Sequence, residues 1–135
     1  MAVFIDTAIL VAVRNRSDNM HSAATRLMAA GLQGEYGRMR TSDFVLDEAT
    51  PTALARTHRR DLAVSTGKFV IDSPRIELLS VGRQHFDLAW KKFLSLDKRP
   101  MSFTDCTTLA LMEAHGIEKI MSFDAEFDDL AERIH

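Results

Sequence analysis

The sequence predicts an α/β fold in which a central, mostly parallel sheet is covered by helices. Short apolar runs typical of buried strands alternate with longer segments whose apolar residues recur at helical spacing. Parallel strands need long crossover connections, and the intervening helices supply them. The chain has 135 residues, of which 46% are hydrophobic, so it can bury one real core. We therefore expect residues 1–135 to form a single domain.

Two strands and four helices are expected in the first half of the chain. The strands cover residues 2–5 and 38–42, and the helices cover residues 8–14, 21–32, the segment from Val45 to Leu54, and 61–69. Asp18 can cap the second helix, and Ser42 or Asp43 can cap the third. Pro51 lies inside the third helix, where a proline is expected to kink or divide it.

The second half repeats the alternation of strand and helix. A strand is expected over residues 76–81, and Gly82 then opens a helix that carries aromatic residues on one face. Ser102 or Thr104 can cap the next helix, which runs to Gly116. A strand over 119–123 ends at Asp124, and a short helix is expected over 125–132. Residues 134–135 leave room for only a stub of a final strand.

Composition excludes several classes of protein. The 17 Lys and Arg residues against 19 Asp and Glu residues give a formal charge of −2, so no strong global field attracts polyanions. A nucleic-acid partner would need bound metal ions or local basic patches, such as Arg56, Arg59 and Arg60. The single cysteine, Cys106, excludes an internal disulfide, and no signal peptide or membrane span is recognisable. We expect a cytoplasmic protein with no membrane association.

Three acidic residues, Asp6, Asp105 and Asp124, are expected near the carboxyl ends of the strands or at an adjoining helix start, where a parallel sheet binds ligands, and Glu48 joins them as a fourth candidate. Asp6 and Asp124 each end an apolar strand, Asp105 lies in a first helical turn, and Glu48 lies early in a helix that follows a strand. Converging carboxylates repel one another unless they are protonated or bind a cation. Oxygen ligands alone suit Mg²⁺ or Mn²⁺ rather than zinc. Such ions activate water and stabilise charge on phosphate, so the pattern indicates phosphodiester hydrolysis.

The segments around these acids resemble the successive acidic motifs of PIN domains, especially those of VapC-type toxins. They occur in the family's order and extend from near the first residue to near the last. The four segments are Phe4-Ile5-Asp6-Thr7, Thr41-Ser42-Asp43-Phe44-Val45-Leu46-Asp47-Glu48, Ser102-Phe103-Thr104-Asp105-Cys106 and Ser122-Phe123-Asp124-Ala125-Glu126-Phe127.

The resemblance implies a three-layer α/β/α fold and an endoribonuclease that depends on Mg²⁺ or Mn²⁺. By position, Asp6 and Asp105 would be the central metal ligands, and Glu48 and Asp124 would complete the site directly or through water. Thr7, Thr104 and Ser122 would support them with hydroxyl groups. The implied partners are an RNA substrate, a small antitoxin protein and a second copy of the chain. The alternative is a PIN-like domain of weak or no activity that serves as a protein- or RNA-binding platform.

Simpler structural roles compete with these assignments. Asp6 and Asp105 can act as helix caps, Glu48 can be a solvated helical residue, and Asp124 can belong to a turn. For Asp128 the turn or cap role is favoured. Cys106 has no histidine placed to activate it, so a packed cysteine is expected.

Two surface features also have ordinary interpretations. The set of Phe86, Trp90 and Phe93 predicts core or a partner interface rather than a base-stacking platform. The group of Arg56, His58, Arg59 and Arg60 fits an exposed charged helix end better than a phosphate contact.

Two other families begin with an apolar strand ending in Asp. Phosphotransferases of the haloacid dehalogenase type need a second Asp two positions later, where this chain has Ala8. Response-regulator receivers need an acidic pair near the first strand and an Asp at the end of a middle strand. Residues 75–81 provide no such acid, so both families are disfavoured.

Overall fold

The computed structural model describes all 135 residues and contains one five-stranded sheet. The strands are β1 (Ala2–Ile5), β2 (Arg38–Ser42), β3 (Ile76–Leu79), β4 (Lys119–Met121) and β5 (Glu132–Ile134). Their order is β3-β2-β1-β4-β5, and every pair is parallel. The expected central sheet is therefore confirmed, and all of its strands, not only most, run in one direction.

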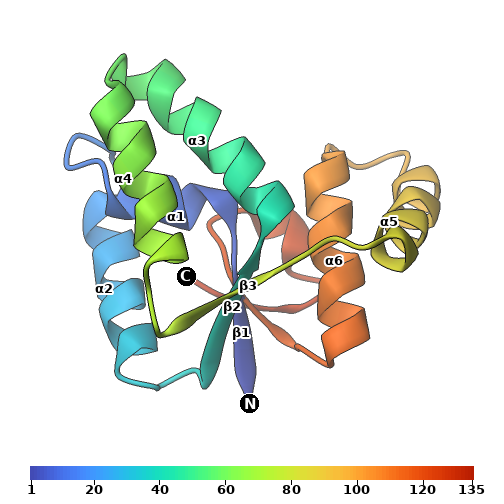
Figure 1. Ribbon diagram of the computed structural model, residues 1–135. Coiled ribbons are helices and arrows are strands. Elements are labelled where there is room, and N and C mark those ends of the chain that lie inside the picture. Colours follow the sequence, from blue (N-terminus) through green and yellow to red (C-terminus); the bar gives the residue numbers. More distant parts are fainter.

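Helices connect the strands and cover both faces of the sheet. They are α1 (Thr7–Val13), α2 (His21–Leu32), α3 (Asp43–Thr57), α4 (Arg60–Ile71), α5 (Arg83–Ser95) and α6 (Phe103–His115), and a 3₁₀ turn, η1 (Ala125–Phe127), precedes β5. In Figure 1, α2 and α4 lie on one side of the sheet and α6 lies on the other, with α5 packed outside α6. This is the three-layer α/β/α arrangement that the family resemblance implied. None of the helices is both long and apolar enough to cross a membrane.

The first strand lies at the centre of the sheet and of the core. Val3, Phe4 and Ile5 are fully buried, because helices cover both faces of β1 and strands flank both of its edges. This explains why β1 reads as a continuous apolar run rather than an alternating one. The strand ends at Asp6, so the central strand places this carboxylate at the middle of the carboxyl edge.

Several boundaries differ from the expectations. Asp18 does not cap α2: it accepts a hydrogen bond from the Met20 N–H at 2.8 Å, and the N-cap residue Met20 makes no side-chain cap. Pro51 does not divide α3, which runs unbroken. The carbonyl that loses its helical donor belongs to Asp47, and both residues are exposed, so water can satisfy it.

The sheet ends also differ. β3 stops at Leu79, whose partner Ser42 is the last residue of β2, and the Val81 N–H instead donates to Asp43 at 3.0 Å. β4 stops at Met121. The helix expected over 125–132 is only the short turn η1, and the final strand is not a stub: β5 begins at Glu132 and pairs with β4 over three residues.

The aromatic face of α5 is not part of the core. Phe86, Trp90 and Phe93 are 39%, 50% and 38% exposed, and Ala89 is the only buried residue of the helix. Their rings surround Phe103 at the start of α6, with centroids 5.0–6.2 Å from it. The core interpretation of this set is therefore wrong, and a surface role remains.

Candidate active site

Asp6 lies where the direction of the sheet's connections reverses. The chain passes from β1 to β2 and β3 on one side, and to β4 and β5 on the other. Crossovers that diverge in this way leave a crevice beyond the carboxyl ends of the two central strands. The Asp6 N–H donates to the Met121 carbonyl at 3.0 Å, which fixes this turn against the end of β4.

The Asp6 side chain is almost buried, with 6% of its surface exposed. Its Oδ1 accepts a hydrogen bond from the Thr7 N–H at 2.9 Å, and its Oδ2 accepts one from the Ser122 hydroxyl at 2.7 Å. The pKa of Asp6 is raised to about 6, mainly by burial; the nearby charges of Asp105 and Glu48 act in the same direction, and the two hydrogen bonds oppose the rise. Asp6 is also the N-cap of α1, so capping and a site role coexist.

Asp105 is held by a reciprocal cap at the start of α6. The Ser102 N–H donates to Asp105 Oδ2 at 3.0 Å, and the Asp105 N–H donates to Ser102 Oγ at 3.1 Å. Burial raises the pKa of Asp105, and the charges of Glu48 and Asp124 act in the same direction. An ionised carboxylate stabilises a helix N-terminus, so burial and the neighbouring acids act against the capping role of Asp105.

Asp124 and Glu48 approach from two further elements. Asp124 accepts a hydrogen bond from the Glu126 N–H at 2.9 Å and donates its own N–H to Ser122 Oγ at 3.0 Å, which orients it at the start of η1. Glu48 lies in the second turn of α3. Thr52 and Arg56 follow it at intervals of four residues, and helical geometry places all three on one face.

The four acids line one cleft of about 310 Å³. Thr7, Ala8, Thr52, Arg56 and Ser102 complete its lining. None of the four carboxylates forms an ion pair with Lys, Arg or His, although the chain contains eight such pairs elsewhere. No three acidic, histidine or cysteine side chains converge tightly enough to form a metal cluster as they stand. Mutual repulsion of the carboxylates favours rotamers that keep them apart.

The donor set fits a hard divalent cation. Every acidic ligand candidate offers carboxylate oxygen, and the Thr7 hydroxyl is buried at the cleft with no hydrogen-bond partner. Buried polar atoms are nearly always satisfied, so an orphaned hydroxyl beside the buried Asp6 carboxylate indicates room for water or an ion. Oxygen donors of this kind suit Mg²⁺ or Mn²⁺.

The supporting residues named from sequence separate into two groups. Thr7 and Ser122 contact the site as described. Thr104 precedes Asp105, but only its carbonyl makes a hydrogen bond, which it accepts from Thr107.

Asp128 is exposed and pairs with Arg133 at 2.6 Å, which lowers the pKa of Asp128, and it does not line the cleft. Cys106 is buried, and burial raises the pKa of its thiol, as expected for a packed cysteine.

Sequence reasoning missed Thr52 and Ser102 as cleft residues. Thr52 is detectable in principle, because it follows Glu48 by four residues and must share its helical face. Ser102 was assigned only as a cap. Its position in the lining follows from the reciprocal bond with Asp105, which draws both side chains to the same end of α6.

Comparison with known proteins gives one family. The model described as "PIN domain" matches residues 3–133. The protein named 23S rRNA-specific endonuclease VapC20, known from two strains of Mycobacterium tuberculosis, is 31% identical over 126 residues, which are 93% of this chain and 91% of that protein.

Solved structures show the same fold. The crystal structure of Mycobacterium tuberculosis VapC20, titled a sarcin-ricin loop cleaving toxin, matches with a TM-score of 0.84 and 29% identity over 95% of this chain and 94% of that one. VapBC2 from Rickettsia felis, bound to a DNA fragment from its promoter, matches with a TM-score of 0.69 and 13% identity, covering 99% and 98%. FitAcB from Neisseria gonorrhoeae matches with a TM-score of 0.67 and 11% identity, covering 98% and 96%. The last two likenesses concern the fold alone.

Proposed function

Because this chain belongs to the PIN-domain family, we propose that it is a single-domain, metal-dependent endoribonuclease that hydrolyses RNA phosphodiester bonds in the cytoplasm. One observation carries the proposal: Asp6, Glu48, Asp105 and Asp124 line one cleft, and no basic side chain pairs with any of them. Asp6 is buried and the other three acids are half-buried, and gathering them without a cationic partner is costly, so a bound cation would explain why they lie together. The likeness to VapC20, which is named an endonuclease of 23S rRNA, supports RNA as the substrate.

The residues of the cleft have separate roles in this proposal. Asp6 and Asp105, the two acids whose pKa is raised by burial, hold Mg²⁺ or Mn²⁺, and Glu48 and Asp124 complete its environment directly or through water. When bound, such an ion activates water and neutralises charge on the phosphate. Ser122 orients Asp6 and Asp124 through one hydroxyl, and the unpartnered Thr7 hydroxyl is free to bind a metal-bound water.

Cleavage by purified protein tests this assignment. We expect wild-type protein to cut ribosomal RNA when Mg²⁺ or Mn²⁺ is added and to leave it intact in EDTA. Asp6→Asn and Asp105→Asn remove one charge each from the cleft and should abolish cleavage. Asp128→Asn is the matched control, since this exposed acid pairs with Arg133 outside the cleft. Undiminished cleavage by Asp6→Asn would overturn the proposal, and a wild-type protein that binds no Mn²⁺ and cuts no RNA would favour a binding platform.

The proposed physiological role is that of the toxin in a VapBC-like, type II toxin–antitoxin pair, with a small antitoxin as partner. The resemblance to VapC20, titled a toxin, supports this role. A gene for a small DNA-binding protein directly beside the gene for this chain would provide the candidate antitoxin. Co-expression of that protein should prevent both growth arrest and RNA cleavage by this chain.

We also propose a homodimer formed through the aromatic face of α5. The face carries Phe86, Trp90, Phe93 and Leu94, all between 38% and 58% exposed. A two-fold interface pairs a patch with its own copy, which suits an apolar patch better than a charged one. Light scattering should give the mass of two chains for wild type and of one for Trp90→Asp. A wild-type mass of one chain would contradict the dimer.

A further inference from the structure

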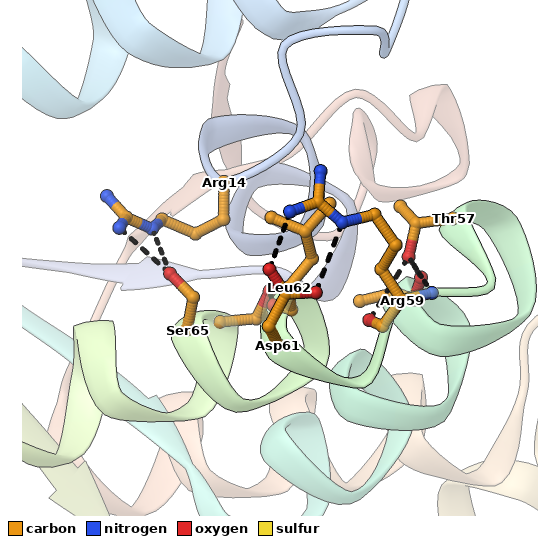
Figure 2. Close-up of polar contacts among 8 residues, drawn as sticks. Arg14, Thr57, Arg59, Asp61, Leu62 and Ser65 are labelled. Carbon is orange, nitrogen blue, oxygen red and sulfur yellow. Dashed lines mark hydrogen bonds and ion pairs between the residues drawn. The ribbon is translucent and has the colours of Figure 1, made fainter.

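A second pocket, rich in arginine, adjoins the acidic cleft. It has a volume of about 460 Å³ and lies between the loop after α1 and the junction of α3 with α4. Arg14, Arg16, Arg56 and Arg59 line it, and no acidic residue does. Figure 2 shows Arg14 and Arg59 above the start of α4, with Leu62 between them. In a chain whose net charge is −2, this concentration of guanidinium groups is local.

The positive charge of this pocket is only partly balanced. Arg59 pairs with Asp61 at 2.6 Å, and Arg56 pairs with Asp18 at 3.4 Å. The Arg14 guanidinium donates to the neutral Ser65 hydroxyl at 3.0 and 2.8 Å, and Arg16 has no side-chain partner. Two guanidinium groups therefore remain without an acidic partner.

Two of the arginine side chains, Arg14 and Arg59, are positioned before any ligand binds. Arg14 also lies over the Phe69 ring, with its guanidinium carbon 5.4 Å from the ring centroid. Arg59 makes two hydrogen bonds to Asp61. A guanidinium has five N–H donors, so each of these side chains keeps donors for another acceptor. Held in place, they lose less conformational entropy when they bind a phosphate.

Arg56 joins the pocket to the acidic cleft, because it lines both. It lies on the same face of α3 as Glu48, two turns later. An RNA strand with one phosphate at the four acids can continue past Arg56 into the arginine pocket. We propose that this pocket binds backbone phosphates of the RNA strand beside the phosphate that is cleaved. This inference rests on the proposed function, and it adds the path of the substrate.

Salt-dependent binding of a defined RNA tests the proposal. The probe is a 5′-fluorescein-labelled single-stranded RNA of mixed sequence, and its anisotropy is followed in EDTA at several KCl concentrations. The logarithm of the affinity falls linearly with the logarithm of the salt concentration. Each phosphate contact that is lost should make this slope less steep by about 0.7. We expect this change, with affinity weakened several-fold, for Arg16→Gln and for Arg56→Gln. Arg75→Gln is the control, since this exposed arginine precedes β3 at the opposite, amino edge of the sheet.

Three outcomes would overturn the inference. In the first, Arg16→Gln and Arg56→Gln keep the wild-type salt slope. In the second, Arg75→Gln makes the slope less steep by the same amount, which would mean that net charge rather than the pocket determines binding. A fluorescein-labelled polyglutamate peptide could bind more tightly than RNA and lose its binding in the two pocket variants, which would assign the pocket to an acidic protein segment. Metal-dependent cleavage by wild type and Asp6→Asn is measured separately. Unaltered slopes alongside normal cleavage reject only the pocket, and cleavage by Asp6→Asn rejects only the proposed active site.

Discussion

The Ser122 hydroxyl donates a hydrogen bond to Asp6 over 2.7 Å and accepts one from the Asp124 N–H at 3.0 Å. One buried side chain therefore orients two of the four acids. The bond to Asp6 opposes the effect of burial on its pKa. Ser122→Ala should raise the pKa of Asp6 above about 6 in the metal-free protein.

This change should appear in the pH profile of cleavage. At subsaturating Mn²⁺, protonated Asp6 competes with the metal, so the acid limb of the Ser122→Ala profile should move to higher pH. Activity should fall more at pH 6 than at pH 8. Ser122→Thr keeps the hydroxyl and should restore the wild-type limb. An equal loss at every pH would show that Ser122 does not act through the protonation of Asp6.

The burial of Asp6 predicts a cost in stability. Its pKa rises from 3.8 to about 6 on folding, so the folded protein binds this proton more tightly than the unfolded chain does. The contribution of Asp6 to stability is therefore most favourable below pH 4 and declines as the pH rises to 6. Above pH 6 the burial of the charged Asp6 side chain costs about 3 kcal/mol of folding free energy, which corresponds to its pKa shift of roughly two units. Urea unfolding in EDTA from pH 4 to pH 7.5 measures it.

Asp6→Asn should make the decline in stability smaller, because its amide carries no charge, and Asp105, whose pKa is also raised, accounts for part of what remains. The variant should match wild type near pH 4 and exceed its free energy of unfolding at pH 7. Asp128→Asn should retain the decline, since Asp128 is exposed. If the free energies of unfolding of wild type and Asp6→Asn changed in parallel from pH 4 to pH 7.5, the predicted cost of burying the Asp6 charge would be wrong.

Asp105 combines a cap with a proposed metal ligand, and two substitutions separate these roles. Asp105→Asn keeps an oxygen that can accept the Ser102 N–H, so stability should change little while cleavage falls at least about 100-fold. Ser102→Ala removes the reciprocal cap and should cost about 1 kcal/mol. Its cleavage should persist, because the carboxylate remains. A large loss of stability in Asp105→Asn would assign this residue to capping alone.

Gly34 and Gly37 form a matched pair before β2. Both have positive φ, of 88° and 81°. A Cβ at Gly34 would meet nothing within 4 Å, whereas one at Gly37 would lie 2.3 Å from the Met1 carbonyl oxygen. Gly34→Ala should cost about 1–2 kcal/mol for the left-handed backbone. Gly37→Ala should cost clearly more stability, because the Met1 carbonyl also accepts the Arg38 N–H and cannot move away freely. Thermal unfolding measures both variants, and equal losses of stability would contradict the predicted clash at Gly37.

Local signals predicted the strands and helices that carry the acids. An apolar run ending in Asp6 and a cap at Ser102 are each contained within a few residues, so they could be recognised without knowledge of contacts. The existence of β5 could not be predicted with the same ease. Its three residues include Glu132 and Arg133, and their strand conformation depends on pairing with β4.

The aromatic face of α5 shows a second limit. Helical spacing of Phe86, Trp90 and Phe93 predicts that they share a face but not which neighbour covers it. In the fold, Ala89 of this face packs against α6 and is buried, whereas the larger side chains surround Phe103 at the start of α6 and stay partly exposed. The arginine pocket likewise depends on tertiary structure, because it joins Arg14 and Arg16 to residues about 40 positions later.

The central place of β1 also determines when the site can form during translation. Asp6 is synthesised before its partner Ser122, which follows it by 116 residues. At about 5–20 residues per second, ribosomes need roughly ten seconds to cover that distance. Until β4 emerges, the nascent chain has three of the four acids but lacks one neighbour of its central strand. Prematurely terminated products that lack β4 would therefore also lack Asp124 and the assembled acidic cleft.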